Sequence, residues 1–187
     1  TNNGTISALN GGSIQLQSHL TGASSSQLVA GAGSTILQQG VTVSGVVNTS
    51  GSGSFRPTNN GNNFLSGVTL NGTLDMASAL SNERVIGNLA LNGTVNLNAD
   101  SILSFQGTNT LSGAGTIVFG NSGNNRLGVD NNGVLTIGAT TTLRGVNANI
   151  GDVPLFRGNG QVVNQGLISS DSGGTFTLRN PHNGLVN

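Results

Sequence analysis

The stretch Gly72-Thr73-Leu74-Asp75-Met76 is a phrase that returns four more times along the chain. The other copies are Gly93–Leu97 (GTVNL), Gly115–Phe119 (GTIVF), Gly133–Ile137 (GVLTI) and Gly174–Leu178 (GTFTL). Each copy is a glycine turn followed by alternating apolar and polar residues, the pattern of a strand with one buried face. Copies at near-constant spacing predict the stacked coils of a solenoid.

The glycines that open the phrase are 21, 22, 18 and 41 residues apart, and the last interval covers two coils. Gly53, Gly33 and Gly12 extend the series toward the N-terminus. A circuit of roughly 21 residues accommodates three short strands and three turns, because a strand rises about 3.3 Å per residue. The sequence therefore predicts an all-β fold, a right-handed parallel β-helix of about nine coils with three short strands per coil. Residues 1–187 are expected to form one domain.

One face of the repeated strand is apolar throughout, and we expect its side chains to stack inside the solenoid. Fully burying such a side chain contributes about 1.5–3 kcal/mol, which outweighs the entropic cost of the many glycines. The predicted core stack consists of Ile14, Leu16, Leu74, Met76, Val95, Leu97, Ile117, Phe119, Leu135, Ile137, Phe176 and Leu178.

Asn and Gly supply 27 and 31 of the 187 residues, and they gather at the predicted corners. Both tolerate positive φ, and an Asn at equivalent corners can hydrogen-bond its counterpart one coil away. Ser50–Asn63 and Val146–Phe156 interrupt the rhythm and are predicted to be enlarged loops, the places where a solenoid would carry specific sites. Met76–Arg84 is predicted to be a helical turn or a loop, with Glu83 and Arg84 exposed.

The composition argues against several kinds of partner. All six basic residues are Arg, six residues are acidic and the net charge is zero, so we expect no binding of nucleic acid. The chain has no Trp or Tyr on which bases or sugars would stack. No apolar run approaches the length of a membrane span, so no membrane insertion is expected. Without Cys, stability must come from backbone ladders and a packed interior.

No constellation of catalytic or metal-binding residues emerges from the repeat. Polysaccharide lyases and hydrolases on β-helices need several carboxylates and a basic residue such as Arg126 in one groove. Here the repeat does not align the carboxylates, and each is predicted to be a solvated surface group: Asp75, Asp100, Asp130, Asp152 and Asp171. His19 and His182 are far apart, without a partner at metal-ligand spacing. We expect no enzyme, no cofactor and no metal site.

An outward row of hydroxyls provides an alternative function. In the predicted register this row runs Ser13, Thr73, Thr94, Thr116, Val134, Thr175, while the second outward row is chemically mixed. Regular hydroxyl arrays on a flat solenoid side are typical of binding to ice or to a glycan surface. Such binding is kept as the alternative, and a lyase or hydrolase as a less favoured one.

The repeat style and the Asn-Gly corners resemble the β-strand-repeat regions of large bacterial surface proteins. These are filamentous haemagglutinin-like adhesins and the passenger domains of autotransporters. The string Asn180-Pro181-His182-Asn183-Gly184 is similar to the Asn-Pro-Asn-Gly motif of haemagglutinin secretion domains, with an extra His. The resemblance implies a secreted protein at the bacterial cell surface with a structural and adhesive function, and surface glycans as possible partners.

The two ends of the chain share a pattern. Gly4–Leu16 and Gly166–Leu178 match without gaps, so the last coil is interpreted as the predecessor of the first. We therefore expect a section of a fibre, continued by further coils of the same chain or by copies of itself stacked end to end. The candidate end-to-end contacts are Gly4, Ile6, Ile168, Leu178, Leu185 and Val186.

Overall fold

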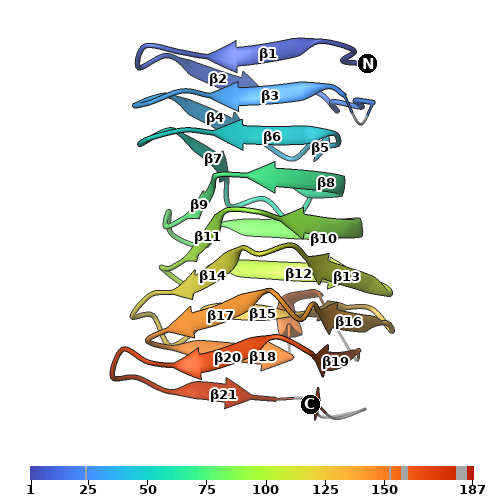
Figure 1. Ribbon diagram of the computed structural model, residues 1–187, viewed down its shortest axis with the longest axis vertical. Helices are drawn as coiled ribbons and strands as arrows, with labels where there is room; N and C mark the ends of the chain where they lie inside the picture. The colour runs from blue at the N-terminus through green and yellow to red at the C-terminus, as the bar shows by residue number, and fades with distance from the viewer. Residues whose placement is uncertain (24, 152, 157–159, 180–184) are drawn as a thin grey trace.

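The computed structural model describes residues 1–23, 25–151, 153–156, 160–179 and 185–187. Over these residues the chain winds into a parallel β-solenoid of about eight turns, with about 22 residues per turn (Figure 1). The first and last turns lie at opposite ends of the long axis. The predicted all-β solenoid is confirmed, with about eight coils where the sequence suggested nine.

Two parallel sheets form the walls of the solenoid. The eight-stranded one, here called the flat sheet, receives one strand from each coil. Its strands are β2 (Ser13–Leu16), β4 (Thr35–Gln38), β7 (Ser54–Pro57), β9 (Thr73–Met76), β11 (Thr94–Leu97), β14 (Thr116–Phe119), β17 (Thr142–Gly145) and β20 (Leu167–Ser170).

The 14-stranded sheet is folded along its length, so it supplies two limbs. Its two longest strands, β8 (Phe64–Asn71) and β10 (Asn82–Leu91), run through both limbs. They turn where Gly67 and Gly87 have positive φ, which glycine adopts without a steric penalty. The remaining strands of limb A are β5 (Thr42–Val43), β12 (Ile102–Gln106), β15 (Arg126–Asp130), β18 (Ala148–Gly151) and β21 (Phe176–Leu178). Those of limb B are β1 (Thr5–Ala8), β3 (Gln27–Ala30), β6 (Val46–Thr49), β13 (Asn109–Ser112), β16 (Val134–Ile137), β19 (Gln161–Asn164) and β22 (Leu185–Val186).

The repeated glycine phrase does not keep to one side of the solenoid. Its copies at Gly72, Gly93 and Gly115 open β9, β11 and β14, which pair as predicted. The copy at Gly133 opens β16 in limb B, and the copy at Gly174 leads into β21 in limb A. This part of the predicted register is wrong, because any side of the solenoid can use a glycine corner followed by an alternating strand.

The predicted match between the two ends is displaced for the same reason. Thr5–Ala8 lies in limb B, whereas Leu167–Ser170, the segment that matches it in sequence, lies in the flat sheet. The last coil is therefore not the direct structural predecessor of the first in the predicted register.

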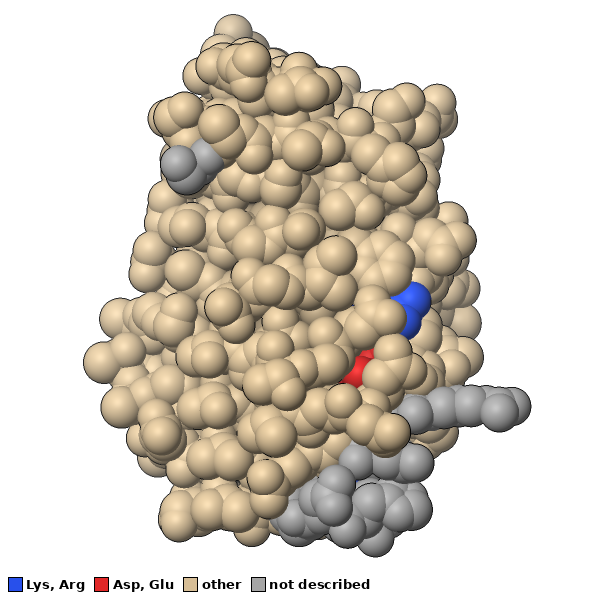
Figure 2. Space-filling model, turned by 90° about the vertical axis from the view of Figure 1, so that its right-hand side faces the viewer, with Lys and Arg blue, Asp and Glu red and all other residues tan. Residues whose placement is uncertain are grey.

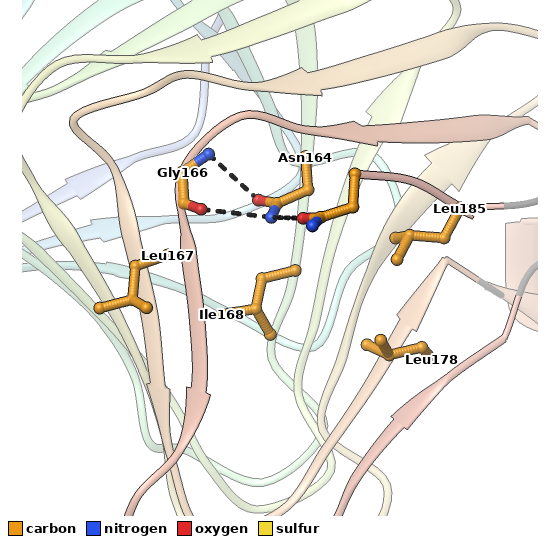
Figure 3. Close-up of a pocket in the computed structure, with 7 residues that line it drawn as sticks. Asn164, Gly166, Leu167, Ile168, Leu178 and Leu185 are labelled. Atoms are coloured by element: carbon orange, nitrogen blue, oxygen red, sulfur yellow. Dashed lines mark hydrogen bonds between the residues drawn. The ribbon is translucent and has the colours of Figure 1, made fainter.

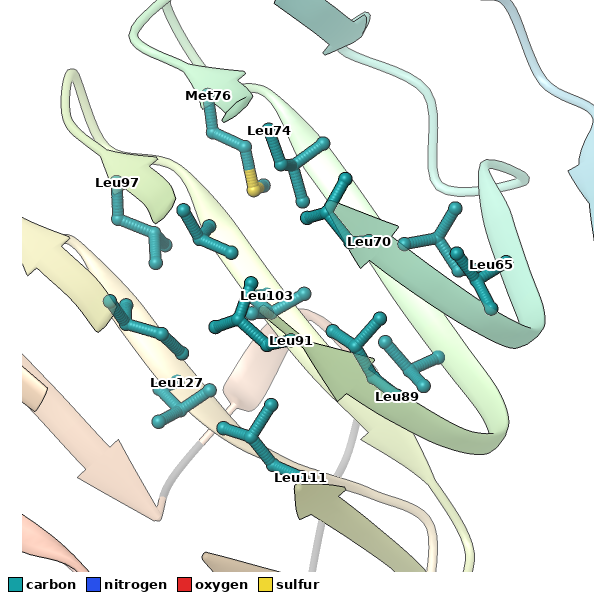
Figure 4. Close-up of a cluster of buried hydrophobic side chains, with 14 of the residues drawn as sticks. Leu65, Leu70, Leu74, Met76, Leu89, Leu91, Leu97, Leu103, Leu111 and Leu127 are labelled. Atoms are coloured by element: carbon teal, nitrogen blue, oxygen red, sulfur yellow. The ribbon is translucent and has the colours of Figure 1, made fainter. Parts of the chain in front are cut away.

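The interior is a continuous stack of aliphatic side chains, as Figure 4 shows for the middle coils. Eight residues of the predicted core stack are 0–1% exposed: Leu74, Met76, Val95, Leu97, Ile117, Phe119, Leu135 and Ile137. Leu16 is also buried, and the half-buried Ile14 and Phe176 pack against the core. Leu178 is 48% exposed, which corrects its predicted place in the core. Among the described strands, β21 pairs with β18 alone, and Leu178 lies beside this edge.

The two predicted loops contain regular structure. Ser50–Asn63 includes β7, whose Phe55 is fully buried, because the strand there still alternates around one apolar residue. Val146–Phe156 includes β18 and the 3-10 turn η1 (Pro154–Phe156). Between Met76 and Asn82 the chain makes a turn and then enters β10, so Glu83 and Arg84 belong to a strand.

The corner amides form the predicted ladder. Asn48 Nδ2 donates to Gln27 Oε1 (3.1 Å), Asn71 Nδ2 to Asn48 Oδ1 (2.9 Å) and Asn92 Nδ2 to Asn71 Oδ1 (3.0 Å). Asn48 and Asn71 thus each donate to the coil before and accept from the coil after. The polar composition therefore has a structural role between coils.

Candidate functional site

Each of the five described acidic residues either forms a contact within the fold or is buried in its interior. On the flat sheet, Asp75 pairs with Arg56 (3.0 Å). Farther along the axis, Asp171 pairs with Arg144 (2.8 Å), and this contact lowers the pKa of the Asp171 carboxyl against the effect of desolvation. Asp100 accepts a hydrogen bond from Ser122. Asp152 lies outside the described residues.

Arg84 and Asp130 form a clamp on the wall of limb A. Their side chains are 16% and 1% exposed and form an ion pair. The guanidinium lies between the rings of Phe64 and Phe156, with its central carbon 4.6 Å from each ring centroid. Arg84 also donates to the carbonyl of Gly61 (3.3 Å). These contacts tie η1 to coils far above it in the stack.

The clamp corrects two predictions. Arg84 was expected to be exposed and Asp130 to be a solvated turn residue, but the two are brought together from β10 and β15. The intervening strand β12 places Ser104 opposite Arg84, and Gly128 follows opposite Ser104, so small residues leave room for the long side chain. No local pattern could reveal a pairing of residues 46 positions apart.

Glu83 is a third corrected prediction in this region, because it lies inside the solenoid and is fully buried. Desolvation raises the pKa of its carboxyl well above its usual range, and hydrogen bonding lowers that pKa only in part. The alternation of β10 explains the position, since Glu83 and the buried Val85 are two residues apart and point to the same face.

The remaining polar groups do not assemble a metal site in the part of the chain that the structure describes. His19 Nδ1 accepts a hydrogen bond from the backbone N–H of Thr42 (2.9 Å). No group of three potential metal ligands occurs among the described residues. His182 and the string Asn180–Gly184 lie outside them. Likewise, no helix within the described ranges is long and apolar enough to cross a membrane.

The outward hydroxyl row is longer than predicted. The register of the flat sheet aligns residues from seven successive coils: Ser13, Thr35, Ser54, Thr73, Thr94, Thr116 and Thr142. Leu167 follows in the eighth. Val134 and Thr175, which the sequence placed in this row, lie off the flat sheet. Neighbouring strands are about 4.7–4.9 Å apart, so the row is a periodic array. Figure 2 shows another face, with a single basic and a single acidic spot.

A concave feature lies at the C-terminal end of the stack, where β20, β21 and β22 meet (Figure 3). This end cavity has a volume of about 540 Å³ and is lined by Asn164, Gly166, Leu167, Ile168, Leu178, Leu185 and Asn187. Leu167 and Leu178 are 57% and 48% exposed. Three predicted end-contact residues, Ile168, Leu178 and Leu185, are thus brought together.

The polar rim of the end cavity continues the corner pattern. Asn164 Nδ2 donates to Asn187 Oδ1 (2.7 Å) and to the Gly166 carbonyl (3.2 Å), while the Gly166 N–H donates to Asn164 Oδ1 (3.2 Å). The end-contact prediction missed these residues, although the matching pairs Val163-Asn164 and Val186-Asn187 are a visible signal. Val186 is exposed and does not line the cavity.

The other predicted end contacts, Gly4 and Ile6, belong to the first coil at the opposite end of the solenoid (Figure 1). They can meet the end cavity only if a second molecule supplies them. No protein-family model matches the chain, and no curated protein or solved structure matches it. The fold and the geometry of its end are therefore the basis of the functional proposal.

Proposed function

We propose that this chain is a structural, non-catalytic section of a β-solenoid fibre, extended by another coil that seats on the end cavity. The observation that carries the proposal is the one-sided pairing of the last strands. Among the described strands, β20 pairs only with β17, β21 only with β18 and β22 only with β19. Strand edges of this kind are templates for pairing with another chain.

The occupant we propose is the first coil of a second copy. Its strands β1 and β2 are also paired on one side among the described strands, with β3 and β4 respectively. Residues 1–55 contain no Asp, Glu, Lys or Arg, so this end lacks the charged side chains that usually protect edge strands. In the stacked fibre β1 would continue limb B below β22.

The resemblance to bacterial adhesins and autotransporter passengers supports a place for this fibre at the bacterial cell surface, outside the cell. There it would provide reach and adhesion, with surface glycans as candidate ligands. The internal use of the described carboxylates supports a role without catalysis.

Electron microscopy and sedimentation velocity over a range of concentrations test the proposal. We expect the chain to form filaments, and the double variant Leu167→Glu/Leu178→Glu to give single solenoids, because it places charge at the apolar end. Leu155→Glu is the matched control, since Leu155 is 62% exposed on η1 and does not line the end cavity. Single particles of the parent chain at every concentration would contradict the proposal, as would equal disruption by the control.

A second candidate function is binding to an ice or glycan surface through the hydroxyl row. The continuity of the row over seven coils favours it, because a periodic surface requires regularly spaced groups. If ice is the ligand, the chain should show thermal hysteresis, which Thr94→Val/Thr116→Val abolishes. Thr136→Val is the control, because Thr136 lies in limb B. No hysteresis in the parent chain, or equal loss in the control, would refute ice binding.

A further inference from the structure

Among the described residues, the carboxyl group of Glu83 lies inside the solenoid. Glu83 is paired in register with Leu103 of β12, and the same column continues with Leu127 and Ile150. All three of these side chains are fully buried. The carboxyl therefore occupies a position that aliphatic residues fill in the following coils.

The side chain of Gln38, at the end of β4, lies next to the Glu83 carboxyl. Its amide nitrogen donates to the carbonyl of Val41 (2.8 Å) and to the carbonyl of Phe64 (3.1 Å). An amide NH₂ has two hydrogens, so both donors are used. Gln38 Oε1 and both carboxyl oxygens of Glu83 are buried and form no hydrogen bond of regular geometry among the described residues, although the nearby Arg84 N–H and the Gln38 side chain offset part of the rise in the pKa of Glu83 that desolvation causes.

An ionised Glu83 fits this arrangement poorly. An ionised carboxylate is an acceptor only, and Gln38 Oε1 is an acceptor as well. If Glu83 were ionised, two unsatisfied acceptors and a negative charge would be buried together, which is costly. A protonated Glu83 can instead donate its O–H to Gln38 Oε1.

We propose that Glu83 is held un-ionised in the folded solenoid by a hydrogen bond to Gln38 Oε1, and that this pair is a pH-sensitive latch between β4 of the second coil and β10 of the fourth. When Glu83 ionises, the latch loses its hydrogen bond and the coils around limb A loosen. The strands β4, β8 and β12 carry no ionisable side chain. The next residue of β10, Arg84, points to the opposite face of the strand and is paired with Asp130.

The sign of the pH dependence follows from the burial. Because the pKa of Glu83 is raised in the fold, the native state keeps a proton that the unfolded chain releases above its ordinary pKa of about 4.3. In that window the free energy of unfolding falls as pH rises. The ratio of folded to unfolded protein decreases by up to about tenfold per pH unit, until the pH passes the folded pKa.

Urea unfolding between pH 5 and pH 9 tests the latch, with the parent chain compared to Glu83→Gln. The glutamine stays neutral and can donate its amide hydrogen to Gln38 Oε1. We expect the stability of the parent chain to fall with pH relative to that of the variant. Asp171→Asn is the control, and its curve should run parallel to that of the parent, because the pKa of exposed Asp171 is lowered. Parallel curves for the parent chain and Glu83→Gln would overturn the proposal.

Infrared spectroscopy of the parent chain provides a second measurement that does not depend on the folding of a variant. The chain has only six acidic side chains, so a single buried acid is resolvable. We expect the carbonyl band of an un-ionised carboxyl to persist at pH 6–7, well above the pH at which exposed carboxyls ionise. The absence of that band from the folded protein at pH 6 would also overturn the proposal.

Discussion

Replacing Gly93 by Ala should disrupt the contact between two coils. An added Cβ would lie 1.9 Å from the carbonyl oxygen of Gly72 and 2.3 Å from its backbone nitrogen. These are backbone atoms of the preceding coil, and they cannot rotate away as a side chain can. The φ angle of Gly93 is not positive, so the effect is one of space between coils and not of backbone conformation.

The magnitude follows from what must move. Overpacking of a close contact costs about 1–3 kcal/mol. Two ladder hydrogen bonds adjoin the site, from the Thr94 N–H to the Gly72 carbonyl (2.7 Å) and from the Thr116 N–H to the Gly93 carbonyl (2.9 Å). Weakening one or both adds about 0.5–1.5 kcal/mol each. We therefore expect the free energy of unfolding to fall by about 2–5 kcal/mol, and Tm by about 5–15 °C for a chain of this size.

Urea and thermal unfolding followed by circular dichroism measure this loss. Gly123→Ala is the matched control, because an added Cβ there meets nothing within 4 Å and Gly123 does not have positive φ. Its stability should be unchanged or raised by up to about 1 kcal/mol. A Gly93→Ala variant within about 0.5 kcal/mol of the parent chain, or a control that is equally damaged, would refute the steric reasoning.

Three further substitutions test the clamp, the corner ladder and the core by urea unfolding. Arg84→Met leaves Asp130 buried without its partner and should lower the free energy of unfolding by about 3–5 kcal/mol. Arg144→Met breaks a pair whose side chains are 51% and 33% exposed, so it should cost less than about 1 kcal/mol. Similar losses for the two variants would contradict the structural role of the clamp. Asn71→Ala removes two ladder hydrogen bonds and should cost about 1–2 kcal/mol, so an unchanged midpoint would show that the ladder contributes no stability. Leu91→Ala empties a fully buried position and should cost about 2–5 kcal/mol. Leu80→Ala, at a 49% exposed position, should lie within about 0.5 kcal/mol of the parent, and equal losses for both leucines would refute the assigned core.

The candidate site was partly predictable. Ile168, Leu178 and Leu185 were expected at an end contact from their place in the pattern, and they do line the end cavity. Asn164 and Asn187 were missed, because their hydrogen bond depends on which coil lies beside which. The burial of Glu83 was missed because the residues before β10 are irregular, so the sequence does not show which residues of that strand point inward.

Local pattern by itself determined the class of fold, since alternating apolar residues after glycine corners can bury their side chains only in stacked strands. The core residues Leu74, Val95 and Ile117 followed directly, because their coils have nearly equal lengths. Only the tertiary structure decided which side of the solenoid each later strand occupies. The coil from Thr116 to its partner Thr142 contains 26 residues, so the register shifts there without any change in the local phrase. The clamp has a related cause: Arg84 and Asp130, 46 residues apart, meet because stacking brings together residues two coils apart, and no local preference encodes that contact.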